Sequence, residues 1–179
     1  MTRQLSASRM NMQAFAQQGE PLLGTTPLQD MQRLAHETQG LQPDNAVTWQ
    51  AHAELREHNG EDDDVWLHLD AKTLVPLTCQ RCMHAVAVPV DVDQWYRFVA
   101  TEDIAMAQDD ESEEDLLVME PQFDLLALLE DELLMALPLV PMHEQCPVMS
   151  PVSVDTIEVQ LVDAAKPSPF AVLAQLKKQ

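Results

Sequence analysis

Glycine is scarce in this chain of 179 residues, and its scarcity excludes the common nucleotide-binding loops. The four glycines, Gly19, Gly24, Gly40 and Gly60, are too far apart for a dinucleotide fingerprint. That fingerprint needs three closely spaced glycines, because the backbone must turn tightly and approach the pyrophosphate. After Gly24 the sequence has Thr25 where a phosphate-binding loop requires lysine. The sequence therefore offers no recognisable nucleotide site.

Cysteine and long apolar runs are also scarce. Three cysteines, an odd number, do not form a disulfide framework, and the N-terminal region lacks the apolar stretch of a signal peptide. The longest uncharged apolar stretch, residues 133–142, is interrupted by Pro138 and Pro141 and is shorter than the roughly 20 residues of a membrane helix. We therefore expect a soluble, cytoplasmic protein with no membrane partner.

Basic residues are the third scarcity: 10 Lys and Arg stand against 30 Asp and Glu, for a formal net charge of −20. Residues 98–163 hold 17 acids and no Lys or Arg. Because RNA binding draws affinity from cations that displace counterions at phosphates, this part of the chain should repel RNA. It should attract cationic proteins, unless it serves solubility alone. The candidate partner-binding residues are Asp109, Asp110, Glu111, Glu113, Glu114 and Asp115.

Period-two alternation of apolar and polar residues dominates the middle of the chain and predicts strands over residues 47–55, 65–78 and 86–100. Asn59-Gly60 lies between the first two, and this dipeptide favours the tight turn of a hairpin. A short strand is also expected at residues 116–119. The sequence thus predicts an α+β fold, an antiparallel β-meander of four to six strands with flanking helices.

Helical periodicity predicts helices over residues 6–18, 26–37 and 124–136. In the second, Thr26 and Gln29 have the spacing of a capping box, with Pro27 at the first helical position. In the third, Asp124 lies near the N-cap and Pro138 ends the helix.

We expect a single domain over residues 1–179, with the acidic run forming a solvated, mobile loop. After Pro138 we expect an extended segment, a strand at residues 156–162 and a short C-terminal helix capped by Ser168. The expected parts are a helical N-terminal segment (1–42), the β-meander (43–100), the acidic loop (101–115), a helix and proline segment (116–146) and a tail with the C-terminal helix (147–179).

The sharpest local signal is the motif Cys79-Gln80-Arg81-Cys82, which lies where the second and third predicted strands meet. Two thiolates at this spacing on a turn present half of a tetrahedral zinc site, and His143 with Cys146 supplies a candidate second half. The alternative is a set of reduced, buried thiols. A thioredoxin-like role is less favoured, because that motif opens a helix after a strand.

No catalytic constellation is visible in the sequence. An exposed acidic run does not separate the pKa values of paired carboxylates, as acid–base catalysis requires. His52 and His68 occupy polar strand positions and are expected to face solvent, and no Ser or Cys nucleophile has a base that the sequence identifies. We therefore expect a protein that is not an enzyme.

Four segments together resemble the bacterial YceD family, the large ribosomal RNA subunit accumulation proteins. The resemblance spans nearly the whole chain and keeps the order of a cysteine pair, an acidic and leucine-rich helix and a proline-bounded tail. The matching segments are residues 77–82 (LTCQRC), 124–134 (DLLALLEDELL), 136–143 (ALPLVPMH) and 166–173 (KPSPFAVL).

The resemblance implies a cytoplasmic, non-enzymatic factor in ribosome biogenesis that supports synthesis, processing or accumulation of 23S ribosomal RNA. Many family members carry a second Cys-x-x-Cys-like cluster after the proline segment. In this chain Met149 follows Cys146 at the position where the second cysteine of such a cluster would lie. His143 is the nearby substitute ligand, so the candidate zinc set is Cys79, Cys82, His143 and Cys146.

Three hypotheses of function follow from these features. In the first, the acidic surface holds a basic ribosomal protein or assembly factor of the large subunit and affects rRNA indirectly. The second is direct rRNA binding through a basic patch, which would draw on Arg3, Arg9, Arg33, Arg81, Arg97, Lys166, Lys177 and Lys178. The third is a zinc- or thiol-dependent module or enzyme.

Overall fold

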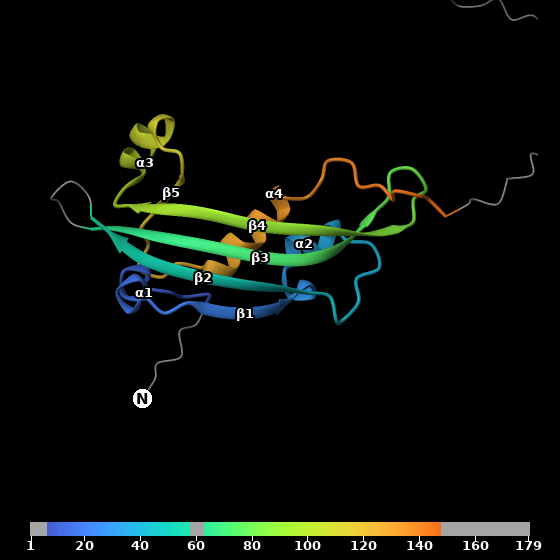
Figure 1. Cartoon of the computed structure of the whole chain (residues 1–179), viewed down its shortest axis with the longest axis horizontal. Helices are drawn as coiled ribbons and strands as arrows, with labels where there is room; N and C mark the ends of the chain where they lie inside the picture. The colour runs from blue at the N-terminus through green and yellow to red at the C-terminus, as the bar shows by residue number, and fades with distance from the viewer. Residues whose placement is uncertain (1–6, 58–62, 148–179) are drawn as a thin grey trace, which may run out of the picture. The chain divides into compact units, whose positions relative to one another are not determined.

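The computed structural model describes residues 7–57 and 63–147, which form an α+β fold around one five-stranded sheet (Figure 1). The order across the sheet is β1-β2-β3-β4-β5, the order in which the strands occur in the chain. The strands are β1 (Leu22–Pro27), β2 (Ala46–Arg56), β3 (Asp64–Thr78), β4 (Ala85–Val99) and β5 (Asp115–Val118).

The three strands predicted from the alternating pattern are confirmed as β2, β3 and β4. The β2–β3 pair is antiparallel, with Arg56 opposite Asp64 at the end near the predicted hairpin turn. The turn itself, residues 58–62, lies outside the described residues. The run predicted over residues 86–100 forms one long strand, β4 (Ala85–Val99), antiparallel to β3.

The sheet is mixed rather than a purely antiparallel meander, because β5 runs parallel to β4. A parallel pair needs a crossover connection, and residues 100–114 supply it. They contain α3 (Glu102–Gln108) and the 3₁₀ helix η2 (Asp109–Glu111), so the acidic run predicted to be a loop is largely helical. Thr101 caps α3, since its side chain accepts from the backbone N–H of Ile104 at 3.4 Å.

The helix predicted over residues 26–37 starts later than the capping-box spacing indicated. Thr26 and Pro27 belong to β1, the 3₁₀ helix η1 (Leu28–Asp30) follows, and α2 covers only Gln32–Glu37. In this edge strand the missing N–H of proline is tolerated. The Trp49 indole holds β1 in place: it lies against Gly24, where a Cβ would be 2.2 Å from the ring, and its Nε1 donates to Thr26 Oγ1 at 3.0 Å.

The first predicted helix is also shorter than expected. The helix α1 covers Met12–Gln18 and is capped by Asn11, whose side chain accepts from the backbone N–H of Ala14 at 2.8 Å. The preceding residue, Met10, instead forms an antiparallel bridge with Phe123. The helix predicted over residues 124–136 is confirmed as α4 (Leu125–Met135), with Asp124 as its N-cap.

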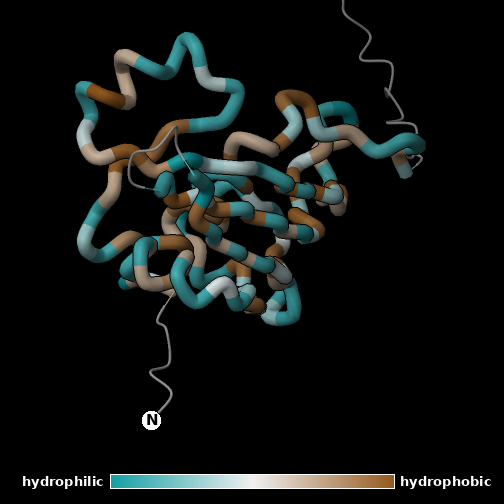
Figure 2. The backbone as a smooth tube through the Cα atoms, turned by 60° about the vertical axis from the view of Figure 1, so that its left-hand side comes forward, coloured by the Kyte–Doolittle hydropathy of each residue, from teal (hydrophilic) through white to brown (hydrophobic). Residues whose placement is uncertain are grey.

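Helices α1, α2 and α4 pack against one face of the sheet, where the core lies (Figure 1). Hydrophobic and hydrophilic positions alternate along the strands in Figure 2, as one buried face requires. The opposite face carries Trp66, His68 and Trp95, and near Arg97 residues from 108–114 cover it. None of the described helices is long and apolar enough to span a membrane.

The β3–β4 hairpin extends beyond the other strands as a two-stranded arm. The pairing of β2 with β3 stops at Lys72, and β5 pairs only with the last residues of β4, whereas β3 and β4 remain paired as far as Thr78 and Ala85. Pro76 and Pro89 lie within this arm, at positions that two-stranded edges tolerate. The arm presents the Cys-x-x-Cys motif at its tip.

The described chain after α4 is irregular up to residue 147, as the prolines predicted. The predicted strand at residues 156–162 and the predicted C-terminal helix lie outside the described residues. The single-domain organisation stays a prediction.

Candidate metal centre

The turn between β3 and β4 holds the first two cysteines. Cys79 follows the last residue of β3, and its backbone N–H donates to the carbonyl of His84 at 2.9 Å. The N–H of Met83 donates back to the carbonyl of Cys79 at 2.9 Å, and Met83 has a positive φ of 61°. These two bonds close a tight loop that brings Cys82 back toward Cys79.

The proline segment that follows α4 brings the other two candidate ligands to the same place. The N–H of Gln80 donates to the carbonyl of Pro141 at 2.9 Å, and the N–H of His143 donates to Cys79 Sγ at 3.4 Å. His143 Nε2 lies 3.1 Å from the carbonyl oxygen of Ala85. This last contact orients the imidazole so that Nδ1 faces the sulfurs.

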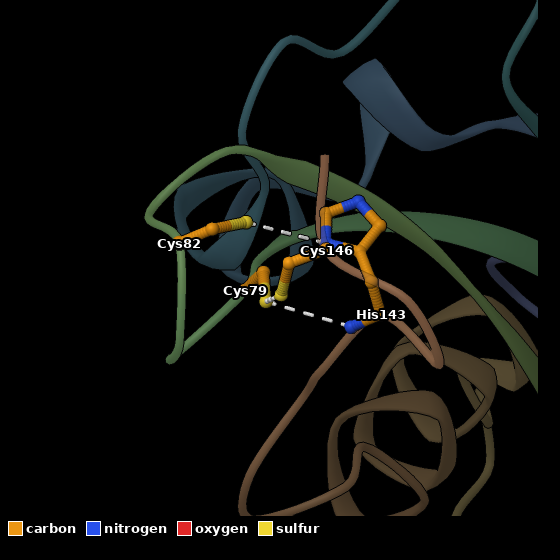
Figure 3. A group of neighbouring side chains, drawn as sticks. All are labelled: Cys79, Cys82, His143 and Cys146. Carbon is orange, nitrogen blue, oxygen red and sulfur yellow. Dashed lines mark hydrogen bonds between the residues drawn. The ribbon is translucent and has the colours of Figure 1, made fainter. Parts of the chain in front are cut away.

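The four predicted ligands, Cys79, Cys82, His143 and Cys146, converge in one cluster (Figure 3). Their ligand atoms all lie within 4.8 Å of one another. Cys79 Sγ is 3.8 Å from Cys146 Sγ, and Cys82 Sγ is 3.4 Å from His143 Nδ1. Two sulfurs bound tetrahedrally at about 2.3 Å from one zinc ion are themselves about 3.8 Å apart. The spacing is therefore compatible with a tetrahedral metal site.

The environment of the sulfurs favours a cation among them. Burial acts to raise the pKa of Cys79, but the N–H groups of His143, Cys82 and Arg81 hydrogen-bond to its sulfur and lower this pKa to about 5. Burial and the neighbouring Cys82 and Cys79 sulfurs raise the pKa of Cys146. Three adjacent thiolates would repel one another, and a bound dication would relieve this repulsion.

The predicted acidic partner site does not form one uniform surface. Asp109, Asp110 and Glu111 form the exposed helix η2, and Glu113 is exposed. Glu114 is different, because its Oε1 accepts from Arg97 Nε at 2.7 Å and its side chain is only 19% exposed. Asp115 starts β5 and accepts from Gln94 Nε2 at 3.0 Å.

The described cations of the predicted basic patch are on separate elements. Arg33 in α2 pairs with Glu130 and Asp131, and Arg97 in β4 is 11% exposed and pairs with Glu114. Arg81 lies in the turn at the tip of the β3–β4 arm, and Arg9 precedes α1. Four others, Arg3, Lys166, Lys177 and Lys178, lie outside the described residues.

Sequence reasoning missed a cluster of rings on the other face of the sheet. The Arg56 guanidinium lies 4.1 Å from the Trp66 ring centre and 4.3 Å from that of Trp95. His68 stacks on Trp95 with centroids 4.5 Å apart, and its Nε2 is 2.7 Å from Asp93 Oδ1. His52 lies opposite His68, and both are half-buried rather than freely solvated. The available signal was that these rings occupy the polar-face positions of the alternating pattern.

Comparison with known proteins gives a family match. Residues 67–177 match the profile of the family described as "Large ribosomal RNA subunit accumulation protein YceD". A protein of Haemophilus influenzae (strain ATCC 51907 / DSM 11121 / KW20 / Rd) with the same description is 40% identical over 114 residues. That match covers 59% of this chain and 61% of the relative. No solved structure matches the chain.

Proposed function

From the premise that the chain belongs to the YceD family of large ribosomal RNA subunit accumulation proteins, we propose that it is a non-enzymatic factor in ribosome biogenesis that supports the accumulation of 23S ribosomal RNA. The observation that carries this proposal is the family match, which covers more than half of the chain. The Cys-x-x-Cys turn, α4 and the proline segment all lie inside the matched range.

Deletion of the gene in its own host tests this role. We expect the ratio of 23S to 16S rRNA to fall, and a plasmid copy of the chain to restore it. An unchanged ratio, with large subunits assembling at the normal rate, would contradict the proposal.

The mechanism we propose is recruitment of a basic ribosomal protein or assembly factor of the large subunit. The carboxylates of Asp109, Asp110, Glu111 and Glu113 are exposed, and residues 98–147 contain no Lys or Arg. Such a field accelerates encounter with cationic proteins, and it repels RNA phosphates. The effect on rRNA would then be indirect.

A variant with Asp109→Asn, Asp110→Asn and Glu111→Gln tests this mechanism, because all three side chains are exposed and carry no core packing. We expect the wild-type protein to retain basic large-subunit proteins that elute as salt is raised, and the variant to retain less of them. Recovery of rRNA without any basic protein, unaffected by the three changes, would reject the mechanism.

We further propose that Cys79, Cys82, His143 and Cys146 hold one zinc ion. Four protein ligands complete the tetrahedral coordination of a zinc ion and leave no open position for substrate, so the role of the ion would be structural. The ion would tie the proline segment to the tip of the β3–β4 arm. The pattern of N–H groups directed at Cys79 supports this, since such bonds stabilise a thiolate ligand.

Elemental analysis of purified protein tests the zinc site. We expect about one equivalent of zinc, lost on His143→Ala and retained on His84→Ala, a matched change at an exposed histidine outside the cluster. Metal-free protein with three titratable thiols would instead support the alternative of reduced, buried cysteines.

Direct rRNA binding through a basic patch is the second candidate function. Arg33 and Arg97 already form ion pairs with carboxylates, which weakens the case for a basic patch in the described part of the chain. Ultraviolet crosslinking of bound rRNA to Arg81 or to the C-terminal lysines would favour it over the protein-mediated mechanism.

A further inference from the structure

A groove of about 410 Å³ lies between α3, β5 and α4, on the parallel edge of the sheet. Its apolar lining includes Leu117 of β5 and Leu128 of α4, both half-buried and therefore partly open to solvent. Four carboxylates also line it, and we call the whole feature the acidic groove. They belong to Glu102, Glu120, Asp124 and Asp131.

The negative charge of the acidic groove is only partly balanced. Asp131 pairs with Arg33, and Asp124 accepts the backbone N–H of Ala127 at 3.0 Å as the cap of α4. Glu102 and Glu120 are exposed, and no described cation forms an ion pair with either. No Lys, Arg or His is among the described residues that line the groove.

Other hollows of the described chain differ in this respect. A larger one of about 580 Å³, between β4 and the proline segment, has Glu144 as its one carboxylate and also contains His143. Another, of about 420 Å³, includes Lys72 beside Asp44 and Asp91. The acidic groove therefore combines apolar lining with an excess of carboxylates in a way that these two hollows do not.

This combination restricts what can occupy the groove. A nucleic acid would bring phosphates against carboxylates, and a second copy of this chain would bring another charge of −20. A purely apolar ligand would desolvate Glu102 or Glu120 without compensation. A segment with Lys or Arg around an aliphatic side chain satisfies both parts of the lining.

We propose that the acidic groove is a docking site for a segment of a cationic protein, in which Lys or Arg residues flank an aliphatic residue that contacts Leu117 and Leu128. This inference rests on the proposed recruitment of a basic partner and gives it a location. The exposed carboxylates of η2 steer the partner by long-range attraction, and the groove retains it by short-range contacts. Steering acts on the association rate, and retention acts on the dissociation rate.

Two synthetic peptides test the site: one in which Lys and Leu alternate, and one in which Ser replaces every Leu at equal charge. We expect the Lys/Leu peptide to bind wild-type protein about tenfold more tightly than the Lys/Ser peptide, measured by calorimetry at physiological salt. We also expect methyl resonances of Leu117 and Leu128 to shift on its addition.

Two alanine-to-lysine variants provide matched controls, because Ala127 lines the groove and Ala107 of α3 does not, while both are exposed. Each adds the same charge at a helical position. We expect Ala127→Lys to weaken the Lys/Leu peptide about tenfold through a faster dissociation rate, and Ala107→Lys to change it less than about twofold. Glu120→Gln, with exposed Glu20→Gln outside the groove and the acidic run as its control, repeats the comparison without adding a side chain to the groove.

Equal weakening by Ala127→Lys and Ala107→Lys, or equal affinity for the two peptides, would overturn the groove as a site. Either result would still be compatible with the proposed recruitment of a basic protein, because non-specific electrostatic attraction explains both. Displacement of the Lys/Leu peptide by an RNA oligonucleotide that shifts the same methyl resonances would also overturn it. The proposed function fails separately, if the full chain retains no basic large-subunit protein.

Discussion

At the scale of single residues, the turn that presents Cys79 and Cys82 depends on one unfavourable backbone conformation. Met83 has a φ of 61°, in the left-handed region that favours glycine. The turn needs this conformation because the chain must reverse before His84 can accept from the N–H of Cys79. A side chain in this region costs about 1–2 kcal/mol.

Replacing Met83 by glycine should therefore stabilise the protein. Met83 is largely exposed, so little packing is lost, and we expect Met83→Gly to raise the free energy of unfolding by about 0.5–1 kcal/mol in urea titrations. Gln80→Gly in the same turn is the control: Gln80 has no positive φ, so glycine there should lower the stability by a similar amount. A loss of stability in Met83→Gly would show that the Met83 side chain contributes more than its conformation costs.

The partly buried ion pair of Arg97 and Glu114 makes stability depend on pH. Burial acts to raise the pKa of Glu114, but the hydrogen bond and positive charge of Arg97 outweigh it and hold this pKa below its usual value of 4.5. A carboxyl whose pKa is lowered in the folded state stabilises that state above the unfolded pKa. This contribution is lost as pH falls below 4.5 and through the lowered value.

Glu114→Gln should therefore destabilise the protein near neutral pH by about 1–2 kcal/mol, because Arg97 loses a charged acceptor. The difference from wild type should shrink as the pH is lowered below about 4, which unfolding curves at several pH values would measure. Glu113→Gln, at the exposed neighbouring position, should show neither effect. A difference that stays constant down to pH 3 would contradict the assignment.

At the scale of secondary-structure elements, α2 is capped by another helix rather than by its own sequence. Met31 at its N-cap makes no capping side-chain bond. Instead Glu130 of α4 accepts the backbone N–H groups of Arg33 at 2.7 Å and Leu34 at 3.1 Å. The capping box predicted at Thr26 is wrong. The group that caps α2 is the side chain of Glu130, which lies 97 residues after Arg33 in the chain.

Two neighbouring acids of α4, Glu130 and Asp131, allow the stabilisation from this cap to be compared with that from a surface ion pair. Glu130→Ala removes the side-chain acceptor of two backbone N–H groups of α2 together with an ion pair to Arg33, and we expect a loss of about 1–2 kcal/mol in the free energy of unfolding. Asp131→Ala removes only an ion pair whose two partners are about half exposed, and should cost less than about 0.5 kcal/mol. Equal losses in thermal or urea unfolding would show that charge, not capping, joins the two helices.

The elements themselves were predictable to different degrees. The strands β2, β3 and β4 follow from local alternation, because each buries one face of a sheet. By contrast, β1 is set by a distant contact: the Trp49 indole lies over Gly24, and the sequence near Gly24 shows no alternation that reveals it. The direction of β5 was also hidden, since a short apolar run does not tell whether its pairing is parallel.

The two candidate sites were also predictable to different degrees. Cys79 and Cys82 lie on one turn, and the spacing of His143 and Cys146 is also local, so a motif could identify both halves. The acidic groove could not be predicted, because its lining comes from α3, β5 and α4 and depends on the crossover that makes β5 parallel.

At the scale of the whole molecule, the net charge of −20 opposes compactness. The excess is concentrated, with 17 acids and no Lys or Arg in residues 98–163. Screening should relieve this repulsion, since the Debye length falls from about 30 Å at 0.01 M salt to about 8 Å at 0.15 M.

We therefore expect the melting temperature to rise by a few degrees between these two salt concentrations, as measured by calorimetry. The same salt increase should weaken binding of a cationic partner. The variant with Asp109→Asn, Asp110→Asn and Glu111→Gln should gain less from salt than wild type does. A melting temperature that falls with salt would mean that attractive ion pairs outweigh the repulsion.

The late position of α4 in the chain has a consequence for how the protein folds during its own synthesis. Leu125, Leu129 and Leu133 complete the core, and Phe123 bridges back to Met10. Translation of the four antiparallel strands therefore finishes with part of their apolar face still uncovered, until α4 leaves the ribosome exit tunnel. Over that interval a nascent chain exposes the hydrophobic surface that α4 later covers, which makes it prone to aggregation and a substrate for chaperones.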